Sequence, residues 1–182
     1  HMVNFGFEGP DLVTSVGTNA KMSEISAAMG LTSLESEPSF AHQNRIIWDA
    51  YTEQFATLPG LSLYTFPEKE INSRQYVVVE VAEECALSRD EIVAVPHAEN
   101  CMARRYFFPG VHRMEPYASL APMSTRWLPN TEALTRRVLT LPTGTAMSPD
   151  LVGRVSTIIA SALTTPKEIA RSVARTAPFA SI

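Results

Sequence analysis

The sequence predicts an α+β fold in which a small, mainly antiparallel sheet packs against helices. Alternating or β-branched apolar residues favour strands at residues 61–66, 76–81 and 103–108. Helical spacing of apolar residues occurs before, between and after these segments. Strands and helices in this order are typical of an antiparallel sheet with helices packed on it.

The N-terminal third is expected to contain an irregular segment followed by two helices. Residues 3–18 are rich in glycine and lack a regular apolar pattern. Ser23 suits the N-cap of a helix over residues 23–35, because its side chain can accept a hydrogen bond from a free backbone N–H group. Pro38 predicts a break, after which a second helix is expected over residues 40–57.

A short helix with a defined start is expected after Ser88. Ser88 and Glu91 have the spacing of a capping box, in which each side chain bonds the backbone N–H of the other residue. Pro96 has no backbone N–H, so a kink or an early end of this helix is expected there. Residues 108–117 follow the third strand and are expected to form a loop.

Two further helices and a tail are expected in the C-terminal third. One helix begins at Asn130 or Thr131 and extends through residues 138 and 139. The other begins after Ser148 and has the clearest apolar stripe in the chain. Residues 164–182 have weak patterning and are expected to form a mobile tail.

Composition narrows the classes of function. The chain has 182 residues, of which 45% are apolar, and a net charge of −4, which gives no electrostatic reason to expect nucleic acid or an anionic membrane. Without a long apolar run or a signal-peptide pattern, we expect a soluble, cytoplasmic protein. Cys85 and Cys101 are too few for a disulfide framework, and no spacing of His, Cys and carboxylate residues indicates a metal site.

The loop before the first predicted helix is the best candidate for binding an anion. It contains Gly17, Asn19 and Lys21. Free backbone N–H groups at a helix start, together with an amide and an ammonium group, can hold a phosphate. From the residues alone, the alternative is a loop in which Asn19 only stabilises its own turn.

Five stretches in a fixed order resemble the DegT/DnrJ/EryC1/StrS aminotransferases, which use pyridoxal 5′-phosphate (PLP) and act on nucleotide-linked keto sugars. The first in importance is Gly17-Thr-Asn-Ala-Lys-Met-Ser-Glu-Ile-Ser-Ala-Ala-Met-Gly-Leu31. The others are Asn4-Phe-Gly-Phe7, Leu58-Pro-Gly-Leu61, Ala103-Arg-Arg-Tyr-Phe-Phe-Pro-Gly-Val-His-Arg-Met-Glu-Pro-Tyr117 and Arg137-Val-Leu-Thr-Leu-Pro-Thr-Gly144.

The resemblance implies the C-terminal small domain of a fold-type I PLP aminotransferase, together with its linking helices. Residues 1–2 look like a cloning scar. Residues 3–38 are expected to be a remnant of the large PLP domain. Residues 39–163 correspond to the small domain with its linking helix, and residues 164–182 to the tail.

The implied reaction transfers an amino group from an amino acid donor, expected to be glutamate, to a nucleotide-linked keto-deoxysugar. In the family, the lysine that binds PLP lies upstream of the Asn-Phe-Gly block. This chain contains three lysines, and none of them lies in the sequence surroundings of the family's PLP-binding lysine: Lys21, Lys69 and Lys167. We therefore expect a part of an enzyme that contains no catalytic residue of its own, binds PLP weakly or not at all, and belongs to a homodimer.

The resemblance also implies roles for single residues. Asn19 matches an asparagine that donates a hydrogen bond to the PLP phosphate of the neighbouring subunit. Lys21 matches a position that lies near the cofactor and the sugar nucleotide. His112 and Tyr106 lie in the block that shapes the sugar pocket. The alternatives are a solvated Lys21, a packing role for Tyr106, and a His112 tethered to a local carboxylate such as Glu115.

Two other functions stay open. A PLP-dependent sugar dehydratase of the same family has histidine in place of the upstream lysine, and this chain does not include that position. A non-catalytic binding or assembly module could instead pair with a separate catalytic chain.

Overall fold

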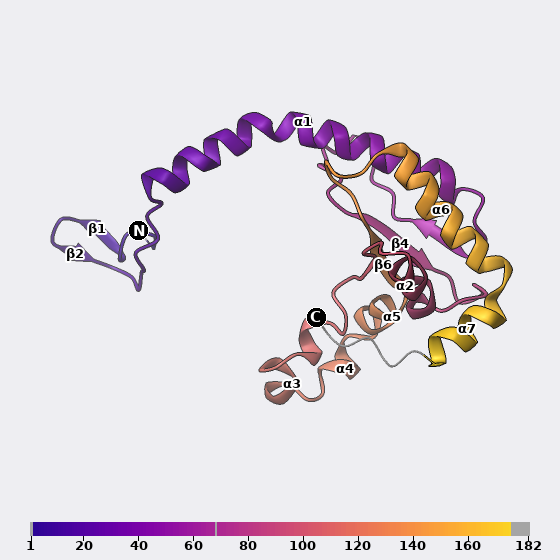
Figure 1. Cartoon of the computed structure of the whole chain (residues 1–182). Coiled ribbons are helices and arrows are strands. Elements are labelled where there is room, and N and C mark those ends of the chain that lie inside the picture. Colours follow the sequence, from indigo (N-terminus) through magenta and orange to yellow (C-terminus); the bar gives the residue numbers. More distant parts are fainter. Residues whose placement is uncertain (1, 68, 176–182) are drawn as a thin grey trace. The chain divides into compact units, whose positions relative to one another are not determined.

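The computed structural model describes residues 2–67 and 69–175 (Figure 1). The chain divides between Ser39 and Phe40 into two compact units. This division falls next to the expected boundary between residues 38 and 39. The assignment of the two parts to a large and a small domain stays a prediction. No described helix is long and apolar enough to cross a membrane.

The first unit contains a small hairpin where an irregular segment was expected. Strand β1 (Phe7–Gly9) pairs antiparallel with β2 (Leu12–Val13). Helix α1 (Glu24–Phe55) begins as predicted, because the Ser23 hydroxyl accepts a hydrogen bond from the backbone N–H of Ser26 at 3.2 Å.

Helix α1 is one continuous helix, so the predicted break at Pro38 is wrong. Proline inside a helix removes one hydrogen bond and costs about 3 kcal/mol. This cost is local, and the helix beyond Pro38 is stabilised by packing: its residues Ile47, Tyr51 and Phe55 are buried in the core. The division between the two units lies between Ser39 and Phe40, within the same turn of the helix as Pro38.

The second unit is built on a four-stranded antiparallel sheet, which confirms the predicted α+β class. Its strands are β3 (Leu61–Leu63), β4 (Val77–Val81), β5 (Arg104–Arg105) and β6 (Val138–Leu141), in the order β3-β4-β6-β5. The strands β3 and β5 are shorter than the predicted segments. Register is defined by pairs such as Val79 with Leu139.

One face of this sheet forms the core. On β4, residues 77, 79 and 81 are buried, while residues 78 and 80 point to the opposite face, which we call the outer face. The C-terminal half of α1 packs into the core with α2 (Arg89–Ala98) and α6 (Pro149–Thr164), which lie along the sheet in Figure 1. The largest fully buried side chains of the helices are Ile47, Tyr51, Ile92, Val152 and Ile159, and they are joined by Leu87, which precedes α2, and by Leu139 of β6.

Both helix starts that were predicted from capping residues are confirmed. Ser88 and Glu91 form the full capping box of α2, and this helix ends at Ala98, soon after Pro96. The Ser148 hydroxyl accepts a hydrogen bond from the backbone N–H of Leu151 at 3.3 Å and caps α6.

Helix α5 (Pro129–Arg137) is followed directly by β6, so the predicted placement of Val138 and Leu139 in a helix is wrong. The buried side chain of Arg89 explains the change. Its Nη1 donates to the carbonyls of Thr135 at 2.7 Å and Val138 at 3.0 Å. The guanidinium thus satisfies carbonyls that would otherwise lack partners where the helix stops.

Several short helices occupy segments without a predicted helix. A 3₁₀ helix, η1 (Val111–Arg113), and helices α3 (Tyr117–Leu120) and α4 (Ser124–Trp127) lie between β5 and α5. Helix α7 (Pro166–Arg175) lies in the expected tail and contacts α2 and α6. Residues 176–182 of that tail lie outside the described residues.

Replacing Arg89 with methionine should destabilise the chain by about 2–4 kcal/mol, because buried carbonyls lose their donor. Urea unfolding followed by circular dichroism measures this change. Arg45→Met is the matched control: Arg45 is exposed and, among the residues that the structure describes, pairs only with Asp49 at 3.7 Å, so its loss should cost less than about 1 kcal/mol. Equal effects of the two substitutions would contradict the role of Arg89.

Candidate functional site

The loop before α1 is held in place by backbone pairing. The N–H of Phe5 donates to the carbonyl of Thr18 at 3.1 Å, and residues Asn4 and Asn19 form an antiparallel bridge. A side chain at Gly17 could not be accommodated, since its Cβ would lie 2.2 Å from the backbone nitrogen of Gly6. The loop therefore has a defined shape.

Asn19 and Lys21 both lie on this loop and are exposed. No residue in the described part of the chain hydrogen-bonds the side-chain amide of Asn19, so an Asx turn is not formed there. The Lys21 ammonium lies over the ring of Phe5, with Nζ 5.4 Å from the ring centroid. An uncommitted amide donor and a cation on the same loop are suited to an anionic group.

His112 is bound to a buried carboxylate from another element. Its Nε2 lies 2.6 Å from Oε1 of Glu132, which is in the first turn of α5. The side chains of His112 and Glu132 are only 8% and 10% exposed. The carboxylate that holds His112 is therefore Glu132 and not Glu115, which corrects the partner suggested in the sequence-based alternative.

Glu132 is the centre of a cluster of basic groups. Arg113 donates to both carboxylate oxygens of Glu132, through Nε at 2.6 Å and through Nη2. Arg136 donates from Nε to the backbone carbonyl of Glu132 at 2.9 Å. The hydrogen bonds from Arg113 and His112 lower the pKa of Glu132 to about 2, although desolvation acts in the opposite direction.

Sequence reasoning did not identify Glu132. The residue looks like an ordinary acid in the first turn of a helix, where it favours the helix dipole. Its partners His112 and Arg113 precede it by about 20 positions. The spacing within α5 therefore gave no indication of the cluster.

Tyr106 and His112 line two adjoining pockets in the second unit. Tyr106 belongs to a pocket of about 680 Å³ over the outer face of the sheet. His112 belongs to a neighbouring pocket of about 570 Å³. Phe107, Thr131 and Thr135 line both. The structure thus brings Tyr106 and His112 near a common wall, while Asn19 and Lys21 lie in the first unit.

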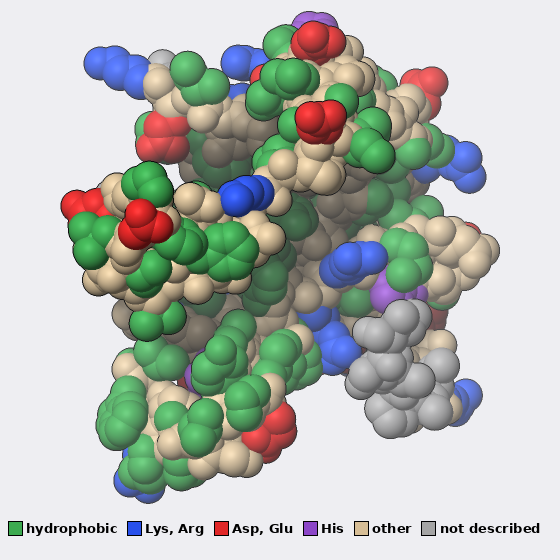
Figure 2. Space-filling view, turned by 90° about the vertical axis from the view of Figure 1, so that its left-hand side faces the viewer, with side chains coloured by type: hydrophobic (Ala, Val, Ile, Leu, Met, Phe, Trp, Pro, Cys, Tyr) green, Lys and Arg blue, Asp and Glu red, His purple; other side chains and the backbone are tan. Residues whose placement is uncertain are grey.

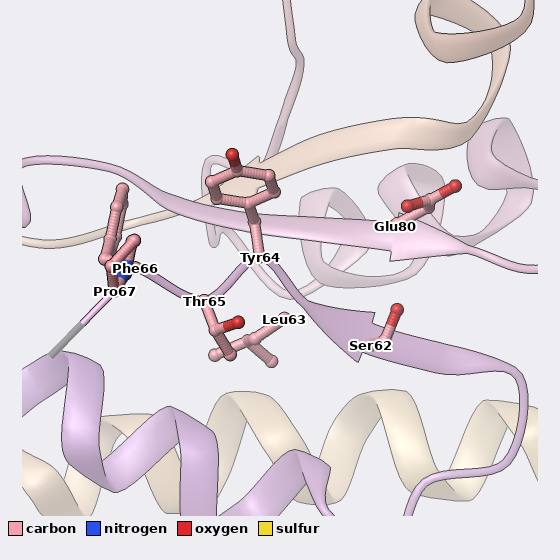
Figure 3. A pocket seen from close by; sticks show the side chains of 7 residues that line it. All are labelled: Ser62, Leu63, Tyr64, Thr65, Phe66, Pro67 and Glu80. Carbon is pink, nitrogen blue, oxygen red and sulfur yellow. The ribbon is translucent and has the colours of Figure 1, made fainter.

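A smaller hollow lies at the edge strand β3 (Figure 3). The side chains of Ser62, Tyr64 and Glu80 project to one side of the sheet, whereas Leu63 and Thr65 project to the other. Figure 2 shows that hydrophobic side chains also gather at the surface. Among the described residues, no group of His, Cys, Asp and Glu side chains could hold a metal ion.

The DegT/DnrJ/EryC1/StrS aminotransferase family model matches residues 2–160. The chain is 28% identical to the dTDP-4-amino-4,6-dideoxy-D-glucose transaminase of Escherichia coli, over 86% of this chain and 42% of that protein. It is also 28% identical to the dTDP-4-dehydro-2,3,6-trideoxy-D-glucose 4-aminotransferase of Saccharopolyspora spinosa, over 71% of this chain and 32% of that protein. The chain therefore spans less than half the length of these relatives.

Solved structures support the same relationship. The crystal structure of DesI in the presence of its TDP-sugar product has a TM-score of 0.80 and 41% sequence identity, covering 95% of this chain and 44% of that one. DesV from S. venezuelae, in complex with a ketimine intermediate, has a TM-score of 0.75 over 89% of this chain and 42% of that one. At 23% identity, this second comparison supports the fold alone.

Replacing Glu132 with glutamine should lower the melting temperature at neutral pH, because the neutral amide loses the ionic hydrogen bonds to His112 and Arg113. The pKa of Glu132 is lower in the folded chain than in the unfolded one. Its contribution is therefore complete above the unfolded value, near 4.5, and is lost as the pH falls toward about 2.

Melting curves of both proteins between pH 7 and pH 2 test this expectation. The difference between them should shrink below about pH 4.5. Glu84→Gln, at an acid outside this cluster, is the matched control and should leave the melting temperature unchanged. A difference between wild type and Glu132→Gln that stays constant across this range would contradict the ionic role of Glu132.

Proposed function

Because the chain belongs to the DegT/DnrJ/EryC1/StrS aminotransferase family, we propose that it is the C-terminal part of a PLP-dependent sugar aminotransferase. The complete enzyme transfers an amino group from an amino acid donor, glutamate, to the keto carbon of a nucleotide-linked deoxysugar. Relatives named as dTDP-sugar transaminases support this substrate class. The coverage of 42% of the E. coli relative supports the view that the chain is one part of an enzyme.

The observation that carries the proposal is the exposed amide of Asn19 on a loop of defined shape. A side-chain N–H₂ group is a neutral donor that fits a phosphate oxygen, and the backbone pairing of the loop keeps it in position. Asn19 therefore fits a role in holding the PLP phosphate. When bound, the cofactor supplies the electron sink for amino transfer.

The other residues are assigned to the sugar nucleotide. Lys21 contributes a positive charge to the same loop as Asn19, which suits the diphosphate of such a substrate. Tyr106 and His112 line adjoining pockets and shape the surroundings of the sugar. Glu132 holds His112 and Arg113, so that the η1 segment keeps its conformation.

The proposal includes the state of the complete enzyme. In the enzymes that this chain resembles, the asparagine that matches Asn19 donates to the PLP phosphate of the neighbouring subunit, so the proposed enzyme is a homodimer. We place it in the cytoplasm, where nucleotide-linked sugars and amino acid donors are both available as substrates.

Replacing Asn19 with alanine in the polypeptide that carries the upstream lysine should weaken PLP binding about tenfold or more. A hydrogen bond to a charged group contributes about 1.5–3 kcal/mol, and 1.4 kcal/mol corresponds to a factor of ten. Absorbance titration gives the PLP affinity, and steady-state kinetics with glutamate give the transaminase rate. Asn130→Ala, which removes the same amide from α5, is the matched control and should change neither.

Unchanged PLP affinity and rate in the Asn19→Ala enzyme would refute the assignment of Asn19. The sequence of the source gene tests the larger proposal. An upstream segment with the PLP-binding lysine supports it. A gene that begins near residue 3, with a catalytic chain that co-purifies, would favour the assembly module instead.

A further inference from the structure

A groove of about 680 Å³ lies between α2, α6 and α7, away from the candidate functional site. All of its described lining residues belong to the second unit, in which these three helices contact one another. We call it the α7 groove. Its apolar walls are formed by Val95 and Ala98 of α2, Ile158 and Ala162 of α6, and Ile169 and Val173 of α7.

The polar groups of the α7 groove do not call for a polar ligand. The Thr157 hydroxyl donates to the carbonyl of Gly153, and the Ser161 hydroxyl donates to the carbonyl of Thr157, each at 2.8 Å. These two donors are thus committed to the backbone of α6. Among the described lining residues, Glu99 is the one carboxylate, and there is no lysine or arginine. An uncharged and largely apolar occupant suits such walls.

Helix α7 forms one side of the groove and buries little surface of its own. It is 10 residues long, and none of its described residues is buried. Ile169 is only partly buried against the core. Isolated helices shorter than about 12–15 residues are marginal in water, so a helix of this length depends on packing of its apolar face. An apolar cover over the groove would supply the burial that α7 lacks.

The residues that follow α7 have the composition of such a cover. The segment Thr176-Ala-Pro-Phe-Ala-Ser-Ile182 contains no charged side chain, and its largest apolar residues are Phe179 and Ile182. Residues 166–175, in contrast, carry charges of both signs. An uncharged segment with two large apolar side chains complements a groove that has apolar walls and no basic group.

The same segment begins beside the groove and is long enough to follow it. Helix α7 ends at Arg175, and Ser172 and Val173 near its end line the groove. An extended chain covers at most about 3.3–3.6 Å per residue, so residues 176–182 can reach about 24 Å. The α6 wall, from Thr157 to Thr165, is only about 12 Å long at about 1.5 Å per helical residue.

We propose that residues 176–182 dock in the α7 groove, with the ring of Phe179 inserted between α2 and α6. Because the segment belongs to the same chain, its effective concentration at the groove is on the order of millimolar, so docking needs no tight intrinsic affinity. Docking buries the Phe179 ring together with the apolar walls, and it holds α7 against α2 and α6. This role is independent of the aminotransferase activity proposed above.

Methyl NMR of the complete 182-residue chain tests the contact directly. We expect nuclear Overhauser effects between the ring protons of Phe179 and the methyl groups of Ile158 and Ile169. A mixed sample, in which half of the molecules carry labelled phenylalanine and the other half labelled isoleucine, should show none, because the contact lies within one chain. Their absence in the fully labelled chain would overturn the proposal. Their presence in the mixed sample would also overturn it and would make a second copy the occupant.

Substitution of Phe179 tests the contribution of docking to stability. Phe179→Ala should lower the melting temperature by about 3–6 °C, because the apolar walls of the groove lose their largest cover. Phe179→Leu keeps an apolar side chain and should retain more than half of this difference. Ser181→Ala is the matched control in the same segment and should shift the melting temperature by less than about 1 °C. An unchanged melting temperature in Phe179→Ala would contradict the proposal.

Discussion

The buried guanidinium of Arg89 is the contact on which the arrangement of the second unit depends. It reaches from the start of α2 to the carbonyls of Thr135 and Val138, where α5 ends and β6 begins without an intervening loop. Burial lowers the pKa of Arg89, while the nearby carboxylate of Asp90 partly offsets this effect. The same guanidinium lies over Phe108. One side chain thus connects the end of a helix, the central strand pair and the segment that carries the candidate site residues.

The contacts of Arg89 join the core of the second unit to the segment beside the outer face of the sheet. Phe108 lies against Arg89 and Arg105, and the neighbouring Phe107 has a positive φ and an exposed ring. Helix α5 contributes to both regions: Glu132 binds His112 and Arg113, while Thr131 lines the adjoining pockets. The sheet is therefore covered by helices on one face and carries aromatic rings on the other. The helices bury the core, whereas the rings of Tyr76 and Phe107 are exposed on the outer face.

Local patterns predicted much of the fold, and long-range contacts account for the rest. The capping box at Ser88 and the N-cap at Ser148 depend on neighbouring residues, so both were recognisable in the sequence. Continuation of α1 through Pro38 depends on packing, and the end of α5 depends on Arg89. Neither the continuation of α1 nor the end of α5 can be predicted from a short stretch of neighbouring residues in the sequence. For the site, ordered motifs identified the family, but the partner of His112 is a helix acid that no motif marks.

We propose, as the central claim, that this chain is part of an aminotransferase and that the PLP-binding lysine lies outside it. It is tested most directly by titrating the purified chain with PLP, reducing with borohydride and analysing the product by mass spectrometry. The claim predicts no stoichiometric adduct at any one lysine and no aldimine absorbance band. A single stoichiometric adduct, at Lys21 in particular, would show that the chain carries its own Schiff-base site and would contradict the claim.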